Sequence, residues 1–175
     1  MSHQLIYKRN CRLIALIAIL FFTPVLKLSA QTKTPTKEHK KLSALAGKWT
    51  IKGMEDRVLE ICEMYEGQYF MVCNSEVKTK AGGLSKGVSV FGYSEDLKSH
   101  TYYHYGSTGY SQLLTGNVDD AGNLHLSGEE TRNGKLVKTR VVMTKISEGY
   151  DFKEETSTDN GPWKVATAIT YLRVK

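Results

Sequence analysis

Short runs of apolar and aromatic residues, separated by turn-forming residues, follow one another from Trp49 to the end of the chain. We expect about ten strands, because each run is four to ten residues long and bounded by Gly, Asn, Asp or Ser. The connections are too short for the crossovers that parallel strands require, so the strands should be antiparallel and in sequential order. Closing such a sheet removes its two exposed edges. The pattern therefore predicts a single antiparallel up-and-down β-barrel. The expected strands are 49–52, two in 58–77, 87–93, 100–105, 110–116, 124–128, 136–145, 150–156 and 163–174.

The segment 58–77 is the clearest hairpin signal in the chain. Gly67 can take the positive φ of a tight turn, and a two-residue turn at Gly67 and Gln68 places Cys62 opposite Cys73. Opposed strand positions have Cβ atoms roughly 4.5–5.5 Å apart, near enough for a disulfide after a small adjustment. The same register pairs Tyr65 with Phe70 and Met64 with Met71. Two free thiols, buried as small apolar groups, are the alternative.

Alternation indicates which side chains share a face, with unequal clarity along the chain. In 136–145 one face carries Val137, Thr139, Val141 and Met143. In the last strand one face carries Trp163, Val165, Thr167, Ile169 and Tyr171. In the 58–77 hairpin the pattern does not decide which face is inside, because the apolar Leu59, Ile61, Phe70 and Val72 share a side with Glu63, Asn74 and Glu76.

The first thirty residues have the features of a secretory signal peptide. A basic segment precedes an apolar run over 13–22, and small residues lead to an expected cleavage site after Ala30. An uncleaved N-terminal anchor is the alternative. Residues 31–41 are polar and read as a flexible tether. A short helical turn with Leu42 and Leu45 on one side then opens the barrel domain, 42–175.

Cleavage changes the charge and the cysteine count. Removing four of the 24 basic residues leaves 20 against 18 acidic ones, so the net charge falls from +6 to +2. No basic cluster is interleaved with aromatic residues, and we expect no nucleic-acid partner. Three cysteines become two, an even number that suits an oxidising compartment. We expect an exported monomer, periplasmic or extracellular, with no transmembrane segment in the mature chain.

The segment Gly47-Lys48-Trp49 resembles the Gly-x-Trp signature of lipocalins and related calycin barrels. The resemblance implies that Trp49 plugs one end of the barrel and that Arg173 stacks on it as a cation–π partner. Nearly the whole mature chain also resembles the domain-of-unknown-function 1579 family of bacterial exported, lipocalin-like proteins, which implies a barrel and no particular activity. Where that pattern commonly has Tyr-Asp, this chain has Tyr93-Ser94. The matching residues are Glu38 to Leu42, Gly47, Trp49, Cys62-Glu63, Phe70 to Cys73, Gly87, Gly92 to Ser94, Tyr102-Tyr103, Ser107 to Gly109, Gly116, Gly134-Lys135, Tyr150, Phe152 and Trp163.

Candidate ligand-binding residues gather between positions 93 and 110. His100, Tyr102 and His104 share a strand face, and Tyr93 and Tyr110 add aromatic rings with polar tips. Residues four apart on a strand are about 13 Å apart, so the two histidines cannot bind one metal ion. Ordinary surface or rim residues are the alternative interpretation.

The sequence offers no catalytic constellation and no metal site. No Gly-x-Ser-x-Gly turn or phosphate-binding loop occurs, and Glu129 and Glu130 point to opposite faces. Small barrels resembling nitrobindin hold haem through a histidine on a late strand, whereas no histidine follows His125 here. We therefore expect no haem and no other cofactor.

Three functions are compatible with these features. The first is a binder or carrier of a small apolar or amphipathic molecule, since a closed barrel of this size has room for one ligand. A protein-binding module or inhibitor in the cell envelope is the second, and an exposed aromatic patch would favour it. An enzyme is the third, and it would need titratable groups with shifted pKa values inside the lumen.

Overall fold

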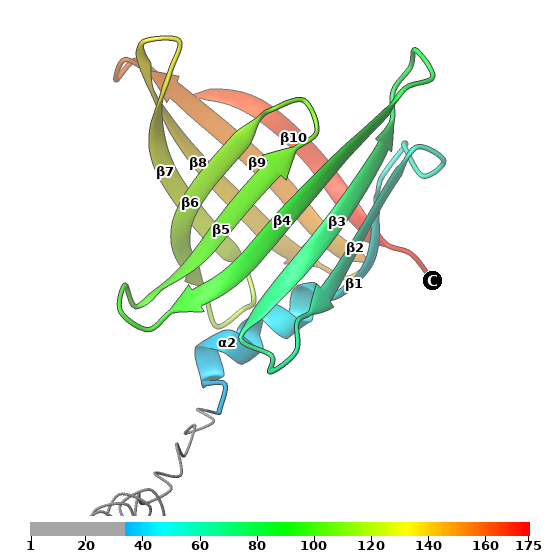
Figure 1. Cartoon of the computed structure of the whole chain (residues 1–175), viewed down its shortest axis with the longest axis vertical. Coiled ribbons are helices and arrows are strands. Elements are labelled where there is room, and N and C mark those ends of the chain that lie inside the picture. The colour runs from blue at the N-terminus through cyan, green and yellow to red at the C-terminus, as the bar shows by residue number, and fades with distance from the viewer. Residues whose placement is uncertain (1–33) are drawn as a thin grey trace, which may run out of the picture. The chain divides into compact units, whose positions relative to one another are not determined.

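A computed structural model of the chain describes residues 34–175, and in it ten antiparallel strands close into a barrel (Figure 1). Each strand pairs with its neighbour in the sequence, and the first pairs with the last. The predicted fold class is therefore confirmed. The strands are β1 (Gly47–Ile51), β2 (Val58–Met64), β3 (Phe70–Lys78), β4 (Leu84–Ser94), β5 (Ser99–Gly106), β6 (Ser111–Val118), β7 (Leu124–Arg132), β8 (Lys135–Ile146), β9 (Gly149–Thr158) and β10 (Lys164–Arg173).

The expected signal peptide lies outside the described residues, as does the first part of the tether. The remainder of the expected tether is folded: α2 (Lys37–Lys41) continues into the 3₁₀ helix η1 (Leu42–Leu45). His39 is buried against Tyr69, and the Lys41 ammonium donates to the Val118 carbonyl at 2.9 Å. Long-range contacts thus order a segment whose composition alone indicated flexibility.

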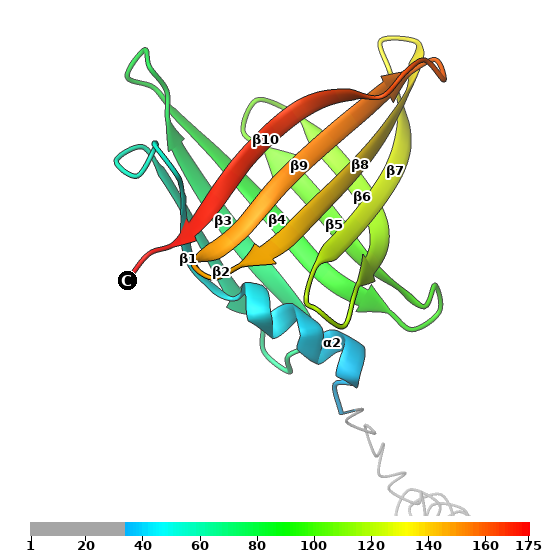
Figure 2. The same cartoon turned by 180° about the vertical axis from the view of Figure 1, so that it is seen from behind.

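The helical segment lies across one end of the barrel and closes it (Figure 2). Leu42 is fully buried there, and the Trp49 indole N–H donates to the Leu45 carbonyl at 2.8 Å. The Arg173 guanidinium lies over the Trp49 ring, with Cζ 4.4 Å from the ring centroid. Gly47 has φ +142°, and a Cβ at this position would collide with that guanidinium. We call this plugged end the floor of the barrel.

The 58–77 hairpin has the predicted register and the predicted disulfide, because Cys62 pairs with Cys73 and their sulfurs are bonded. The turn differs from the two-residue form. Gln68 N–H donates to the Tyr65 carbonyl at 2.8 Å, so the hydrogen-bonded turn begins at Tyr65, and both Gly67 and Gln68 have positive φ. Tyr69 follows this turn, and its ring packs edge-on against His39.

The face that the hairpin pattern left open is now assigned. The disulfide points into the barrel, together with Glu60 and Met71, whereas Leu59 lies on the outer surface. The face that carries Leu59, Ile61, Phe70 and Val72 is therefore the outer one. The buried face is the one that carries the disulfide and the methionines.

The prediction that the odd-numbered residues from Trp163 to Tyr171 share one face is wrong for Trp163 and Val165. A β-bulge between Val165 and Thr167 breaks the alternation, so the two halves of the strand present opposite faces. Trp163 therefore lies on the outer surface, where the Arg140 guanidinium stacks over it at 4.4 Å. Tyr171 keeps its inward position and lines the lumen.

Loss of the disulfide should destabilise the protein by roughly 2–3 kcal/mol, because the free energy of the unfolded chain falls when the cross-link is removed. We expect the oxidised protein to be about two mass units lighter than the reduced one. The double variant Cys62→Ser, Cys73→Ser should have the stability of the reduced wild type in chemical denaturation and should not respond to reductant. A wild type indifferent to reductant would contradict this.

Trp49→Ala should cost roughly 3–5 kcal/mol, because it leaves a cavity at the floor and removes the partner of Arg173. The matched control is Trp163→Phe, at a ring that is 40% exposed against 5% for Trp49. In the Trp163→Phe background, Trp49 should emit at the short wavelengths of a buried indole. A solvent-like emission, or an unchanged melting temperature in Trp49→Ala, would show that Trp49 does not plug the barrel.

Candidate functional site

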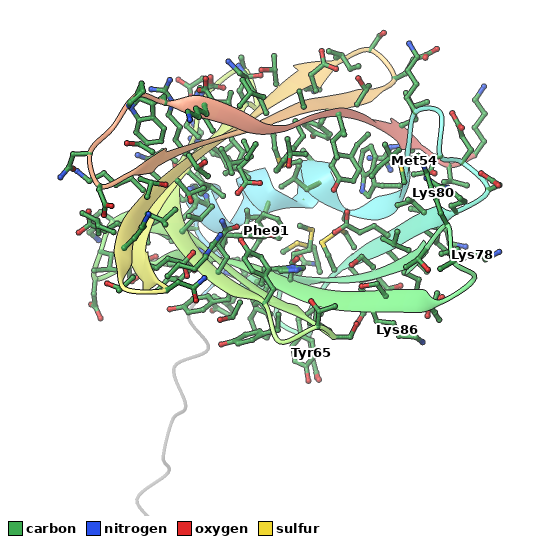
Figure 3. The ribbon with its side chains drawn as sticks, turned by 90° about the horizontal axis from the view of Figure 1, so that it is seen from above. Met54, Tyr65, Lys78, Lys80, Lys86 and Phe91 are labelled. Atoms are coloured by element: carbon green, nitrogen blue, oxygen red, sulfur yellow. A yellow bond between two sulfur atoms is a disulfide. The ribbon has the colours of Figure 1, made fainter. Side chains whose placement is uncertain are left out.

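The barrel is open at the end opposite α2, where the turns at 79–83, 107–110 and 133–134 form a mouth (Figure 3). Viewed from above this mouth, Phe91 lies inside the ring of strands, and Lys78 and Lys86 lie outside it. Between mouth and floor is a cavity of about 70 Å³. This cavity is the candidate site.

Apolar side chains make up the deep part of the cavity. Trp49 and Leu45 form its floor, and residues from β3, β4, β6, β7, β8 and β9 supply the wall. These strands place alternate residues on the inner face, so the period of two selects the lining directly. The apolar wall residues are Met71, Phe91, Leu114, Leu126, Val141, Met143 and Phe152.

Glu60 is the one carboxylate in the cavity lining. Glu60 lies two residues before Cys62 on the inner face of β2. In the sheet it is paired with Trp49 on β1 and with Ser75 on β3. Glu60 is half-buried, and within residues 34–175 its carboxylate forms no hydrogen bond and no ion pair with another side chain or with the backbone. Burial raises the pKa of Glu60 to about 7, because a charged carboxylate loses its hydration there. The group is therefore poised between its two protonation states at neutral pH.

Two tyrosines complete the polar part of the lining. Burial raises the pKa of Tyr102 to about 12, and the negative charge of Glu60 adds to the effect. Burial and then Glu60 also raise the pKa of Tyr171. Both phenols are thus neutral, and together with Glu60 they line one cavity although the three residues come from β2, β5 and β10.

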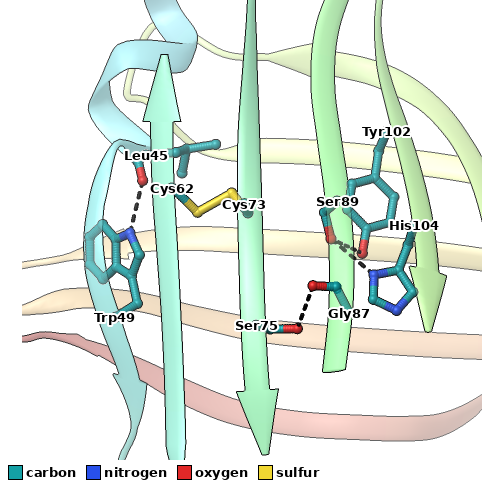
Figure 4. The surroundings of a disulfide bond; sticks show 9 residues. All are labelled: Leu45, Trp49, Cys62, Cys73, Ser75, Gly87, Ser89, Tyr102 and His104. Carbon is teal, nitrogen blue, oxygen red and sulfur yellow. Dashed lines mark hydrogen bonds between the residues drawn. A yellow bond between two sulfur atoms is a disulfide. The ribbon is translucent and has the colours of Figure 1, made fainter. Parts of the chain in front are cut away.

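A small hydrogen-bond network lies beside this group, toward the mouth (Figure 4). Ser89 Oγ is 2.9 Å from His104 Nδ1 and 3.5 Å from the Tyr102 hydroxyl. Burial lowers the pKa of His104, so the imidazole is neutral at pH 7. Nearby, the Gln112 amide donates to Glu154 Oε1 at 3.3 Å. The lumen therefore changes from apolar at the floor to polar toward the mouth.

The five tyrosines and histidines singled out in the sequence fall into two groups. Tyr102 lines the cavity, and His104 and Tyr110 lie beyond it toward the mouth, 5.9 Å apart between ring centroids. Tyr93 and His100 lie at the floor end and contact each other at 5.1 Å. His100 is 1% exposed, with Nε2 3.1 Å from the Glu38 carbonyl and Nδ1 accepting from the Val118 amide. One ring nitrogen thus attaches α2 to the barrel, and the other is bound to β6.

Sequence reasoning missed Glu60 and Tyr171 as parts of the site. The signal for Glu60 was its parity with Cys62, which places it on the disulfide face of β2. Tyr171 was placed correctly on a face, but nothing local distinguished that face as the lumen. Its position opposite Ile51 of β1 arises only when the barrel closes.

The site offers little to a metal ion or to haem. Glu60 and the two cysteines bring three ligand atoms within 4.8 Å of one another, but the sulfurs are bonded to each other and provide no thiolate. His125 lies outside the lumen, with Nε2 3.4 Å from Asp119. A cavity of about 70 Å³ is also far smaller than a porphyrin.

These features define a small closed antiparallel barrel with a plugged floor, an open mouth and an amphipathic lumen. A family model described as "Protein of unknown function (DUF1579)" matches residues 34–173, and the chain belongs to this family. A comparison with curated proteins gives no match. Among residues 34–175, neither helix is long or apolar enough to cross a lipid bilayer.

Glu60→Gln should make the protein more stable at alkaline pH and leave its stability at pH 4 nearly unchanged. The unfolded chain releases the Glu60 proton near pH 4.3 and the folded protein near pH 7. The wild type therefore loses stability from this group as pH rises from about 4 to 8, and the variant does not. We expect the difference between the two proteins to grow by roughly 2–4 kcal/mol over this interval.

The measurement is chemical denaturation of the variant and the wild type at several pH values. At each pH the contributions of the other titrating groups are the same in both proteins, so they cancel in the difference. Glu63→Gln, on the exposed outer face of the same strand, is the matched control and should show no such pH dependence. A difference between Glu60→Gln and the wild type that stays constant with pH would contradict the assignment.

Proposed function

We propose that the protein binds a small amphipathic molecule in the lumen of its barrel. The observation that carries this proposal is the graded lining of the cavity, with apolar residues at the floor and Glu60, Tyr102 and Tyr171 above them. Ligand sites in proteins combine an apolar wall with a few convergent polar groups in this way. The ligand enters with its apolar end first and keeps its polar end near Glu60.

The size of the cavity restricts the apolar end. An engineered apolar cavity of ~150 Å³ accommodates benzene, whereas the cavity here measures about 70 Å³. A narrow alkyl end fits this space better than an aromatic ring does. The remainder of the molecule lies toward the mouth, where the lumen is more polar.

We infer that this binding takes place outside the cytoplasm. A disulfide between Cys62 and Cys73 persists in an oxidising compartment, in agreement with the signal peptide expected from the sequence. We also propose that the protein is a binder and not an enzyme. Ser89 Oγ lies 2.9 Å from His104 Nδ1, but among residues 34–175 no carboxylate hydrogen-bonds to that imidazole to orient it as a general base.

Binding should be measured by calorimetric titration with 1-hexanol, a neutral amphipathic probe of suitable width. We expect saturable binding at one equivalent. Ser89→Phe places a ring into the lumen and should weaken binding by tenfold or more, on the order of the 1–3 kcal/mol that one misplaced apolar group costs. Val88→Phe is the matched control, since Val88 lies on the outer face of the same strand.

Both variants should show the circular dichroism of the wild type. If neither 1-hexanol nor its amine and carboxylic acid counterparts bind saturably to the wild type, the proposed function is wrong. Equal weakening by Ser89→Phe and Val88→Phe would place the bound molecule outside the lumen and contradict it as well.

A second candidate function has an observation of its own. Val88, Tyr103, Tyr105 and Leu113 form an apolar patch on the outer face of β4, β5 and β6, with exposed fractions of 40, 40, 60 and 50%. The register pairs Val88 with Tyr105 and Tyr103 with Leu113, so the patch is continuous. Exposed aromatic patches of this kind favour a protein partner. A photo-crosslinking residue at position 105 should give a defined adduct that the same residue at position 153 does not.

A further inference from the structure

The charges of the lumen are of one sign. Among the residues that line the cavity there is one carboxylate, Glu60, and no lysine or arginine. A second carboxylate, Glu154, lies farther toward the mouth and raises the pKa of Tyr102 together with Glu60. Arg132 is near the mouth, but its guanidinium is paired with Glu130 and lies over the Tyr110 ring at 5.2 Å. The cavity lining therefore presents negative charge to a ligand, with no lysine or arginine among its residues to balance it.

The hydrogen-bonding capacity of the lumen is also one-sided. The Glu60 carboxylate has no partner among residues 34–175, whereas Glu154 already accepts from Gln112. Removing a carboxylate from most of its water without a partner opposes folding, and a ligand that donates hydrogen bonds and carries positive charge removes this cost. Aromatic rings of Phe91, Tyr102 and Phe152 surround the same space, and their faces attract cations.

We propose that the lumen selects amphipathic amines, with the ammonium group of the ligand bound to the Glu60 carboxylate and its alkyl chain directed toward Trp49. This inference rests on the proposed function and names the class of its ligand. A fatty acid is the opposite case: its carboxylate meets Glu60 with no positive charge in the cavity lining to hold the two together. A neutral alcohol lies between, because it can donate to Glu60 without a charge of its own.

Ligand affinity should depend on pH through Glu60. The titratable groups that face the same part of the lumen are Tyr102 and His104 on β5, Tyr171 on β10 and Glu154 on β9. The phenols are neutral throughout this range, and an alkyl ammonium group, like that of lysine, keeps its proton until about pH 10. Affinity for the amine should therefore rise between pH 5.5 and 8, as Glu60 loses its proton. Affinity for a carboxylic acid should fall over the same interval.

The test compares hexylamine, 1-hexanol and hexanoic acid, which share one alkyl chain, by calorimetric titration of the protein at pH 8. We expect hexylamine to bind tenfold to a hundredfold more tightly than 1-hexanol, the range of a charge-assisted hydrogen bond, and hexanoic acid to bind most weakly. At pH 6.5, titration in two buffers that differ in ionisation enthalpy should show that hexylamine binding releases protons to the buffer.

Glu60→Gln should bring the affinity for hexylamine down to that for 1-hexanol, and it should abolish the proton release. Glu63→Gln, on the outer face of β2, should behave as the wild type. If 1-hexanol or hexanoic acid binds as tightly as hexylamine, or if Glu60→Gln keeps the preference, the amine inference is wrong and the proposed function still holds. If none of the three binds, both fail.

Discussion

Closure of the barrel depends on a short seam between β1 and β10, where only three residue pairs are in register: Trp49 with Arg173, Thr50 with Leu172, and Ile51 with Tyr171. A strand of five residues must here satisfy neighbours on both sides. The indole of Trp49 strengthens this seam by packing under Arg173 and by donating a hydrogen bond to η1. Without closure, two edges would be exposed to pairing with other chains, and no enclosed lumen would exist.

The floor and the lumen are consequences of that seam. Trp49, once fixed, provides a surface on which Leu45 and Tyr150 pack, and η1 is held over the barrel end. His100 attaches α2 from the opposite wall through the Glu38 carbonyl. The floor thus uses residues from both halves of the chain, and this explains why a histidine with the position of a ligand-binding residue has a structural role.

Glu60 differs from the residues that build the floor, since an apolar residue in its place would pack at least as well. A half-buried carboxylate without a partner is destabilising, and groups of this kind in a cavity characterise functional sites. The neighbouring phenols and the neutral imidazole of His104 supply polarity without positive charge. The lumen is therefore chemically asymmetric in a manner that folding alone does not require.

The sequence by itself determined the elements, their antiparallel order and the hairpin register, because strand periodicity, turn residues and the spacing of Cys62 and Cys73 are local. It also placed Tyr102 and Tyr171 on definite strand faces. Only the tertiary structure decided which face of the hairpin is inside, since both faces mix apolar and polar residues. It also placed His100 at the floor and His104 near the mouth, since depth in the barrel follows from strand tilt and closure. The same holds for Glu60, Tyr102 and Tyr171, because β10 becomes a neighbour of β1 only when the barrel closes, and all three residues then line one cavity.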